Sequence, residues 1–350
     1  MRAWDVKAVV GLSVIGMLLT GCSSGGGSGA DGKGAAEGSR NKVAGAVEGP
    51  TAAPAELTGT MGSKATDGDF PRTVGHYEGK TEISEQPKRI AALSTGQLDD
   101  LLTLGLVPTA TTRADNAGLV PDYLRDAFPR EESRLTKMTD AGTRSAPNLE
   151  SLEAAEPDLI LVNQSLADLY PKLSKIAPTV VTKGQGINWK RDLLLVGAAV
   201  GKGEQAKSLL DDITDEAAAE GKRTDSAAST VSMVRFTPDR TRMFGVSSFT
   251  GSLAVDMGVG RPKPQKFRAI SEDISTERID LADGDWIFYS VQGDPEKTDA
   301  GSVLAGPLWK SLKGVESGHA VKVDDDPWYL NAGPTAARLV VKQLAASLGS

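Results

Sequence analysis

The chain has 350 residues, which is enough for two domains that each bury a sizeable core. Its formal net charge of −7 argues against nucleic acid as the main partner. It contains one cysteine, Cys22, so no internal disulfide can cross-link the folded part.

The N-terminus has the features of an export signal. Arg2 and Lys7 give a positive start, and the apolar stretch Ala8–Gly21 is shorter than the roughly 20 residues that span a bilayer. The stretch ends in Leu19–Cys22, which resembles the bacterial lipobox, where cleavage precedes the cysteine and acyl chains such as palmitate attach to it. We therefore expect residues 1–22 to be a lipoprotein signal peptide, with Cys22 anchoring the protein to the outer face of the cytoplasmic membrane. An ordinary buried helix that ends at Gly21 is the alternative.

Residues 23–66 are rich in Gly, Ala and Ser and contain almost no large apolar side chain. Such a composition buries too little apolar area to offset the entropy of ordering. It predicts a disordered tether between the lipid anchor and the folded part.

Residues 67–187 have the rhythm of a parallel α/β lobe. A hairpin is expected around Gly79, and apolar strands then alternate with helices. The expected strands are 90–93, 107–111, 158–162 and 178–181, and the expected helices include 97–105 and 149–155. Pro157 ends the second of these helices and favours an extended backbone at Glu156.

A long helical pattern, residues 188–222, follows this lobe, with Gly201 and Gly203 as positions where it can break. Residues 223–350 then repeat the α/β pattern, with expected strands 230–236, 285–289 and 320–323 and a loop or sheet edge at 243–251. The prediction is two Rossmann-like α/β lobes with mainly parallel central sheets, joined by a long helix.

The sequence shows no catalytic or metal-binding constellation. It has two histidines, His76 and His319, no paired cysteines and no phosphate-binding loop. We therefore expect neither enzymatic activity nor a resident metal or cofactor. A membrane-anchored enzyme on the same scaffold is the competing class, because a fold does not fix a function.

One stretch occurs twice. Asn148–Val162 and Ser275–Tyr289 each run from a short helix through a break and an aspartate into an apolar strand. Glu150 and Glu277 each stand eight residues before that aspartate. Each lobe therefore presents one glutamate at an equivalent place, either as a solvated charge or as a docking point for a symmetric partner with basic sockets.

The ordered motifs of the chain resemble the substrate-binding proteins of ABC importers for ferric siderophores, a family that also includes cobalamin and haem binders. The resemblance covers residue 70 to the C-terminus and rests on Thr73–His76, Pro87–Ile90, Leu98–Pro108, Asn148–Glu150, Glu156–Ile160, Leu173–Thr179, Ile274–Glu277 and Pro307–Trp309. It implies the class III periplasmic-binding-protein fold, a monomer, and a ferric siderophore held between two lobes. It also implies that Glu150 and Glu277 engage arginines of the two permease subunits. A haem- or cobalamin-binding protein of the same family is the alternative.

A ferric siderophore needs aromatic walls and a few polar donors. Candidate ligand-binding residues in loops beyond strands or at a helix start are Arg113, Trp189, Arg235, Phe249, Trp328 and Tyr329. Trp189 and Trp328 have a structural alternative, which is packing at the lobe junction. The scarcity of arginines and the acids beside Trp328 favour a hydroxamate-type siderophore over a strongly anionic tris-catecholate.

Overall fold

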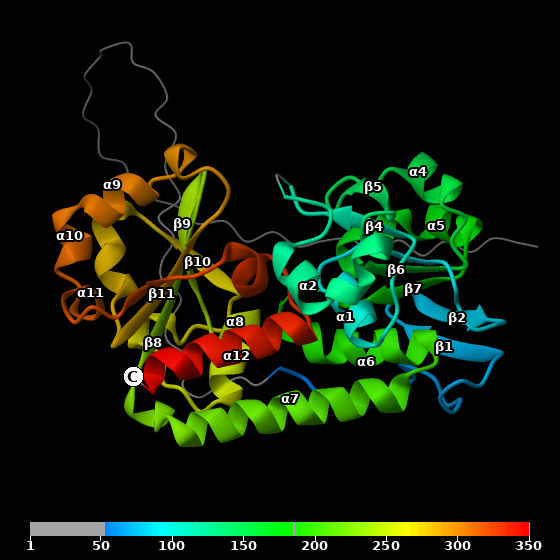
Figure 1. Cartoon of the computed structure of the whole chain (residues 1–350), viewed down its shortest axis with the longest axis horizontal. Helices are drawn as coiled ribbons and strands as arrows, with labels where there is room; N and C mark the ends of the chain where they lie inside the picture. Colours follow the sequence, from blue (N-terminus) through cyan, green and yellow to red (C-terminus); the bar gives the residue numbers. More distant parts are fainter. Residues whose placement is uncertain (1–52, 116, 185, 350) are drawn as a thin grey trace, which may run out of the picture. The chain divides into compact units, whose positions relative to one another are not determined.

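Two five-stranded sheets organise the chain in the computed structural model, which describes residues 53–115, 117–184 and 186–349 (Figure 1). The sheet of the first lobe has the order β5-β4-β3-β6-β7, and the sheet of the second lobe has the order β10-β9-β8-β11-β12. The expected signal peptide, with Cys22, lies outside the described residues.

The first sheet is parallel throughout. Its interior strand β6, between β3 and β7, has no solvent-exposed residue from Leu159 to Val162, so the apolar run that predicted it packs against both layers. The strands are β3 (Ile90–Ala92), β4 (Ala110–Arg113), β5 (Thr139–Thr143), β6 (Leu159–Asn163) and β7 (Thr179–Thr182). The helices are α1 (Gln97–Thr103), α2 (Asp122–Ala127), α3 (Glu132–Leu135), α4 (Leu149–Ala154) and α5 (Tyr170–Ile176). The expected hairpin around Gly79 is formed by β1 (Arg72–His76) and β2 (Gly79–Ile83).

Glu156 differs from its expected extended conformation. Its φ is 44°, in the left-handed region, and it follows the last turn of α4. The right-handed helical region is unfavourable before Pro157, and a left-handed residue closes the helix instead. Arg89 stabilises this turn, because its guanidinium donates hydrogen bonds to the carbonyls of Ala155 and Glu156.

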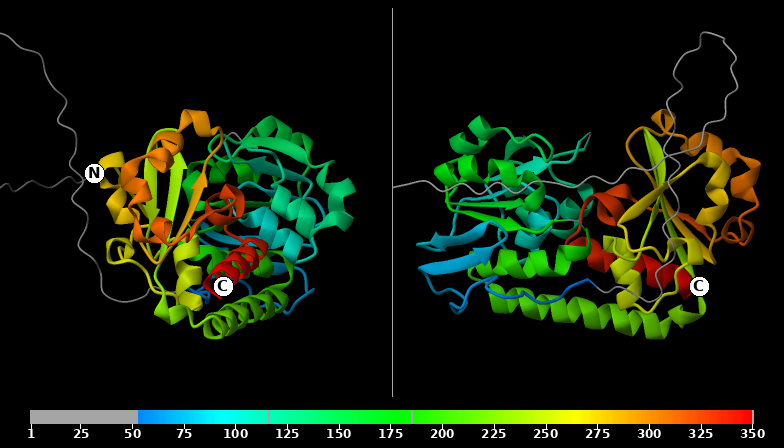
Figure 2. Two further views of the ribbon diagram at one scale, coloured as in Figure 1. Left: turned by 60° about the vertical axis from the view of Figure 1, so that its left-hand side comes forward. Right: turned by 180° about the vertical axis from the view of Figure 1, so that it is seen from behind.

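The connecting segment consists of two helices, α6 (Trp189–Val200) and α7 (Gly203–Arg223). The break falls at Gly201, whose φ is 74°, and a Cβ there would lie 2.9 Å from the ring of Phe70. Helix α7, 21 residues long, packs against α6 at one end and against α8 (Phe249–Asp256) and α12 (Pro334–Leu348) at the other. Figure 2 shows α7 running beneath both lobes.

The second sheet is mixed, which the sequence pattern did not predict. Strands β8 (Val231–Thr237), β11 (Trp286–Val291) and β12 (Ala320–Lys322) are parallel, whereas β9 (Arg240–Phe244) and β10 (Ser271–Ile274) are antiparallel to their neighbours. Besides α8 and α12, the lobe contains α9 (Ala300–Ala305), α10 (Pro307–Lys310) and α11 (Lys313–Glu316). The helix expected after Ser275 is the 3-10 helix η6 (Thr276–Ala282).

Residues 53–66, predicted as the end of the disordered tether, pack against the folded part. Ala53 is 4 % exposed and belongs to the hydrophobic core, and Leu57 packs against that core. Gly62 exchanges two 2.8 Å backbone hydrogen bonds with Gly75 of β1, and Arg191 donates to the carbonyl of Glu56. Backbone pairing and a few apolar contacts therefore order this segment, despite its composition.

None of the described helices combines the length and the apolar character that a membrane span requires.

Candidate ligand-binding site

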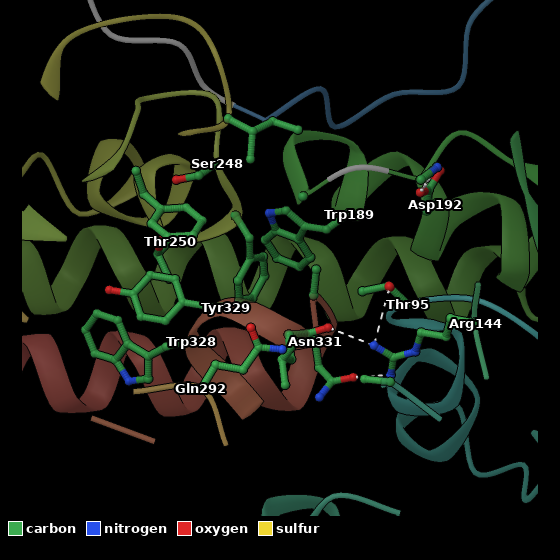
Figure 3. Close-up of a pocket in the computed structure, with 18 of the residues that line it drawn as sticks. Thr95, Arg144, Trp189, Asp192, Ser248, Thr250, Gln292, Trp328, Tyr329 and Asn331 are labelled. Atoms are coloured by element: carbon green, nitrogen blue, oxygen red, sulfur yellow. Dashed lines mark hydrogen bonds between the residues drawn. The ribbon is translucent and has the colours of Figure 1, made fainter. Parts of the chain in front are cut away.

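A cavity of about 430 Å³ lies between the two lobes. The first lobe contributes α1, the loops after β4, β5 and β7, and the start of α6; the second lobe contributes the start of α8 and the segment from Trp328 to Ala332. These loops follow the carboxyl ends of parallel strands, where open α/β sheets form their ligand crevices. Figure 3 shows the side chains that converge on the cavity.

Aromatic rings form one wall of the cavity. Trp189, at the first turn of α6, is 2 % exposed and donates its indole N–H to Ser252 Oγ at 3.2 Å. Its ring meets Phe249 edge-to-face, with centroids 5.6 Å apart and planes at 84°. Trp189 is the first residue of α6 and Phe249 is the first residue of α8, so this contact joins the connecting segment to the second lobe at the cavity wall.

Trp328 and Tyr329 continue this wall from η8 (Asp326–Leu330), a single π-helical turn. Trp328 stacks on Phe288 of β11 at 5.0 Å and 15°, and its indole N–H donates to Gln343 of α12. Tyr329 donates its hydroxyl to the carbonyl of Phe288 at 3.1 Å, and burial raises its pKa far above the ordinary value. Both residues therefore have satisfied polar atoms and line the cavity, Trp328 as a fully buried ring and Tyr329 as a partly exposed one.

Arg144 contributes the positive charge of the cavity, and the sequence analysis missed it. Its guanidinium donates to the carbonyl of Leu330 at 2.9 Å and to Asn331 Oδ1 at 2.6 Å, across the gap between the lobes (Figure 3). Burial lowers the pKa of Arg144. Arg144 directly follows β5, and an arginine just beyond a strand end is a signal for a ligand-binding residue. The apolar pattern of the sequence did not predict β5, so this signal could not be used.

Two buried carboxyl groups also line the cavity. Asp192, on α6, accepts the backbone N–H groups of Lys183 and Gly184 at 2.9 Å and 2.8 Å. Burial raises the pKa of Asp192 to about 7, although these hydrogen bonds oppose the shift. Burial also raises the pKa of Asp100, and the charges of Asp99 and Asp192 add to that effect.

Arg113 and Arg235 lie outside the cavity lining. The Nε of Arg113 is 3.0 Å from Asp140 Oδ2 at the edge of the first sheet. Arg235 forms a two-pronged pair with Asp325 at 2.8 Å and 2.6 Å, which Ser290 completes. Each arginine has a carboxylate partner next to its own strand, and the structure does not bring either of them together with the four aromatic candidates Trp189, Phe249, Trp328 and Tyr329.

Glu150 and Glu277 are exposed, one on each lobe. Asn148 caps α4, because its Oδ1 accepts the backbone N–H groups of Glu150 and Ser151. Glu277 lies in the first turn of η6, and a hydrogen bond from the hydroxyl of Ser275 lowers its pKa. The two glutamates therefore start similar chain segments but stand on different types of helix.

The aspartates that follow these glutamates have a structural role. Asp158 accepts the backbone N–H groups of Lys88 and Arg89, just before β3. Asp285 accepts the N–H and the hydroxyl of Thr230, just before β8. In each lobe the aspartate fixes the start of one central strand to the start of its neighbour, which explains the repeated spacing.

This arrangement defines a class of protein: a binding protein that encloses a small ligand between two α/β lobes. The chain belongs to the periplasmic binding protein family, whose model matches residues 90–327.

Among its relatives is the probable siderophore-binding lipoprotein YfiY of Bacillus subtilis (strain 168), which is 31% identical over 287 residues, 78% of this chain and 86% of the relative. The ferric-anguibactin-binding protein FatB of Vibrio anguillarum (strain ATCC 68554 / 775) is 28% identical over 79% of this chain and 87% of its own. The crystal structure of Staphylococcus aureus SirA complexed with staphyloferrin B superposes with a TM-score of 0.69, at 28% identity, covering 79% of this chain and 98% of SirA.

Proposed function

We propose that this protein captures a ferric siderophore in the cavity between its lobes and delivers it to an ABC importer. The observation that carries the proposal is the aromatic wall of Trp189, Phe249, Trp328 and Tyr329, in a cavity to which both lobes contribute. A siderophore already encloses its iron in ligand atoms, so its binding site needs ring faces and a few polar groups rather than metal ligands. Among the described residues no cluster of three His, Cys, Asp or Glu side chains is arranged to hold a metal ion. The names of the relatives, which include siderophore-binding proteins, support the same ligand class.

The ligand is, in this proposal, a hydroxamate-type complex. Asp100, Asp115 and Asp192 line the cavity, and Arg144 is the cation among the lining residues that the structure describes. A ferric tris-catecholate carries a threefold negative charge, for which the described lining residues offer one cation, Arg144, whereas a ferric trihydroxamate chelate is neutral. This shortage of positive charge in a partly desolvated cavity disfavours the catecholate.

The protein acts, in this proposal, as a carrier rather than an enzyme, tethered outside the cytoplasmic membrane through lipidated Cys22. The membership of a substrate-binding family supports the carrier role. The name of the relative YfiY, a lipoprotein, supports the anchor.

Glu150 and Glu277 are proposed as the docking points for the two permease subunits. Both are exposed, and each stands near the start of a short helix of its own lobe. Exposed ion pairs contribute only about 0–1 kcal/mol each, which suits a partner that must dock and then release.

Intrinsic tryptophan fluorescence tests the ligand class. The domain from residue 53 onward is titrated with a ferric trihydroxamate, a ferric tris-catecholate, ferric citrate, haemin and cobalamin. Quenching that saturates with the trihydroxamate, and that is much smaller in a Trp189→Phe variant, supports the proposal. A Soret shift with haemin would instead favour a haem carrier. No response to any ferric siderophore would refute the proposed function.

A further inference from the structure

Asp100 is a buried carboxyl group that the chain leaves without a partner. It lies on α1, its residue is 2 % exposed, and its side chain lines the cavity between the lobes. Its Oδ1 has no hydrogen-bond partner among residues 53–115, 117–184 and 186–349. A buried polar group without a hydrogen-bond partner destabilises the folded state, and does so more strongly when it is charged. Such a group in a native fold therefore requires an explanation.

The preceding residue, Asp99, shows that a buried acid on α1 can have all the hydrogen-bond partners it needs. Asp99 is equally buried, yet its carboxylate accepts the backbone N–H groups of Thr335 and Ala336, each at 3.0 Å, and the hydroxyl of Tyr123 at 3.2 Å. Asp99 is therefore hydrogen-bonded within the fold, whereas Asp100 lines the cavity and its Oδ1 has no hydrogen-bond partner among the described residues.

Among the described residues, Asp100 forms no ion pair with a cation. Arg144 donates to the neutral acceptors Leu330 and Asn331, with its Nε left without a partner, and Lys190 forms a buried ion pair with Asp256 at 2.7 Å. The other carboxyl group nearby, Asp192, adds negative charge to the same part of the cavity. A positive group that enters the cavity would therefore find an electrostatic complement that the protein does not supply itself.

We infer that Asp100 is the subsite for a protonated amine on the bound siderophore. This inference rests on the proposed function and adds to it the charge of the ligand outside its iron chelate. An ammonium group donates up to three hydrogen bonds and needs no fixed geometry, so a buried carboxyl oxygen without a partner at the cavity suits it. Burial raises the pKa of Asp100, so its carboxyl group loses its proton when the ammonium binds, and the resulting hydrogen bond is charge-assisted at both ends.

A matched pair of ligands tests the inference. Ferrioxamine B is a ferric trihydroxamate with a free terminal amine, and its N-acetylated derivative has the same chelate without the positive charge. The wild-type domain should bind the free amine at least about tenfold more tightly, because a charge-assisted hydrogen bond contributes about 1.5–3 kcal/mol. Asp100→Asn should reduce this ratio to near one. Asp140→Asn, an exposed acid paired with Arg113 outside the cavity, should keep it.

The stability of the empty protein gives a second readout that needs no ligand. Asp100→Asn removes a buried acid without a partner and should leave the melting temperature unchanged or raise it. A clear drop would reveal a structural partner for Asp100 and overturn the inference. Equal wild-type affinity for both complexes would overturn it while the proposed function stands. If the protein binds neither complex, the hydroxamate form of the proposed function fails and the inference fails with it.

Discussion

The carboxylate of Asp99 in the first lobe accepts a 3.0 Å hydrogen bond from the backbone N–H of Ala336 in the second lobe. Thr335 donates its N–H to the same side chain, so an acid on α1 provides the N-terminal cap of α12. This cap requires a glycine at position 333, because a Cβ there would lie 2.5 Å from the Asp99 side chain. The lobes are thus joined through the contact of α1 with α12 as well as through α7.

Asp99→Ala should destabilise the domain by about 2–4 kcal/mol, because it removes a helix cap and leaves buried N–H donors unsatisfied. Asp99→Asn keeps one acceptor oxygen and should lose less. Urea unfolding measures both variants, with Asp140→Ala as an exposed control. Equal stability of Asp99→Ala and the wild type would show that the cap contributes nothing to the fold.

His76 should make the domain less stable as the pH falls. Its ring is buried, with Nε2 2.8 Å from Thr81 Oγ1 and Nδ1 accepting the N–H of Glu78, and burial lowers its pKa from 6.5 to about 4. The unfolded chain takes up the proton first, so this contribution to stability is complete above pH 6.5 and is lost as the pH falls from 6.5 through 4. At pH 4.5 the wild type should have lost about 2–3 kcal/mol more than His76→Gln, relative to pH 7.5. Urea unfolding at the two pH values measures the difference, and parallel losses in both proteins would contradict the prediction.

Arg144→Met should weaken ligand binding by about tenfold or more, since hydrogen bonds to charged groups contribute about 1.5–3 kcal/mol and this side chain holds the cavity segment Leu330–Asn331. Arg113→Met is the matched control. It removes an exposed pair with Asp140 and should change affinity little. Fluorescence titration with a ferric trihydroxamate gives both affinities. A larger effect of Arg113→Met than of Arg144→Met would move the site away from the cavity described above.

Reversing the two docking charges should block transport but not capture. Glu150→Lys combined with Glu277→Lys should bind the ferric siderophore with wild-type affinity and show greatly reduced uptake of radioactive iron by cells. Glu153→Lys makes the same charge change at an exposed position of α4 and should leave uptake intact. Normal uptake by the double variant would remove both glutamates from the docking role.

The periodicity of the sequence was sufficient to predict the parallel strands other than β5, but it did not predict β9 and β10. Buried strands such as β6 are continuous apolar runs, whereas β9 alternates arginine with smaller side chains and β10 is mostly polar. Antiparallel strands at or next to a sheet edge, as β10 and β9 are, have a solvated face, so their composition resembles that of a loop. For the same reason the lobes are less alike than the repeated glutamate spacing indicates.

The aromatic residues of the candidate site could be predicted from the sequence, because this residue type is rare in the chain and has few roles near strand ends. Large aromatics are few in this chain, so those near strand ends were good candidates for a cavity wall, and Trp189, Phe249, Trp328 and Tyr329 line it. Arginines are more numerous, and their partners depend on tertiary contacts: Arg235 faces Asp325, 90 positions later, and Arg144 faces Asn331, 187 positions later. Local patterns contain no information about such pairings.

Helix α7 has a mechanical consequence for the way an importer recognises its carrier. It is one uninterrupted helix, about 31 Å long at 1.5 Å per residue, and its two ends are clamped by packing against different lobes. A stiff rod without a joint opposes wide swinging of the lobes, so the radius of gyration from X-ray scattering should be nearly the same with and without ligand. The permease would then distinguish a loaded carrier from an empty one by small changes at the mouth of the cavity, and not by a change in the overall shape of the carrier.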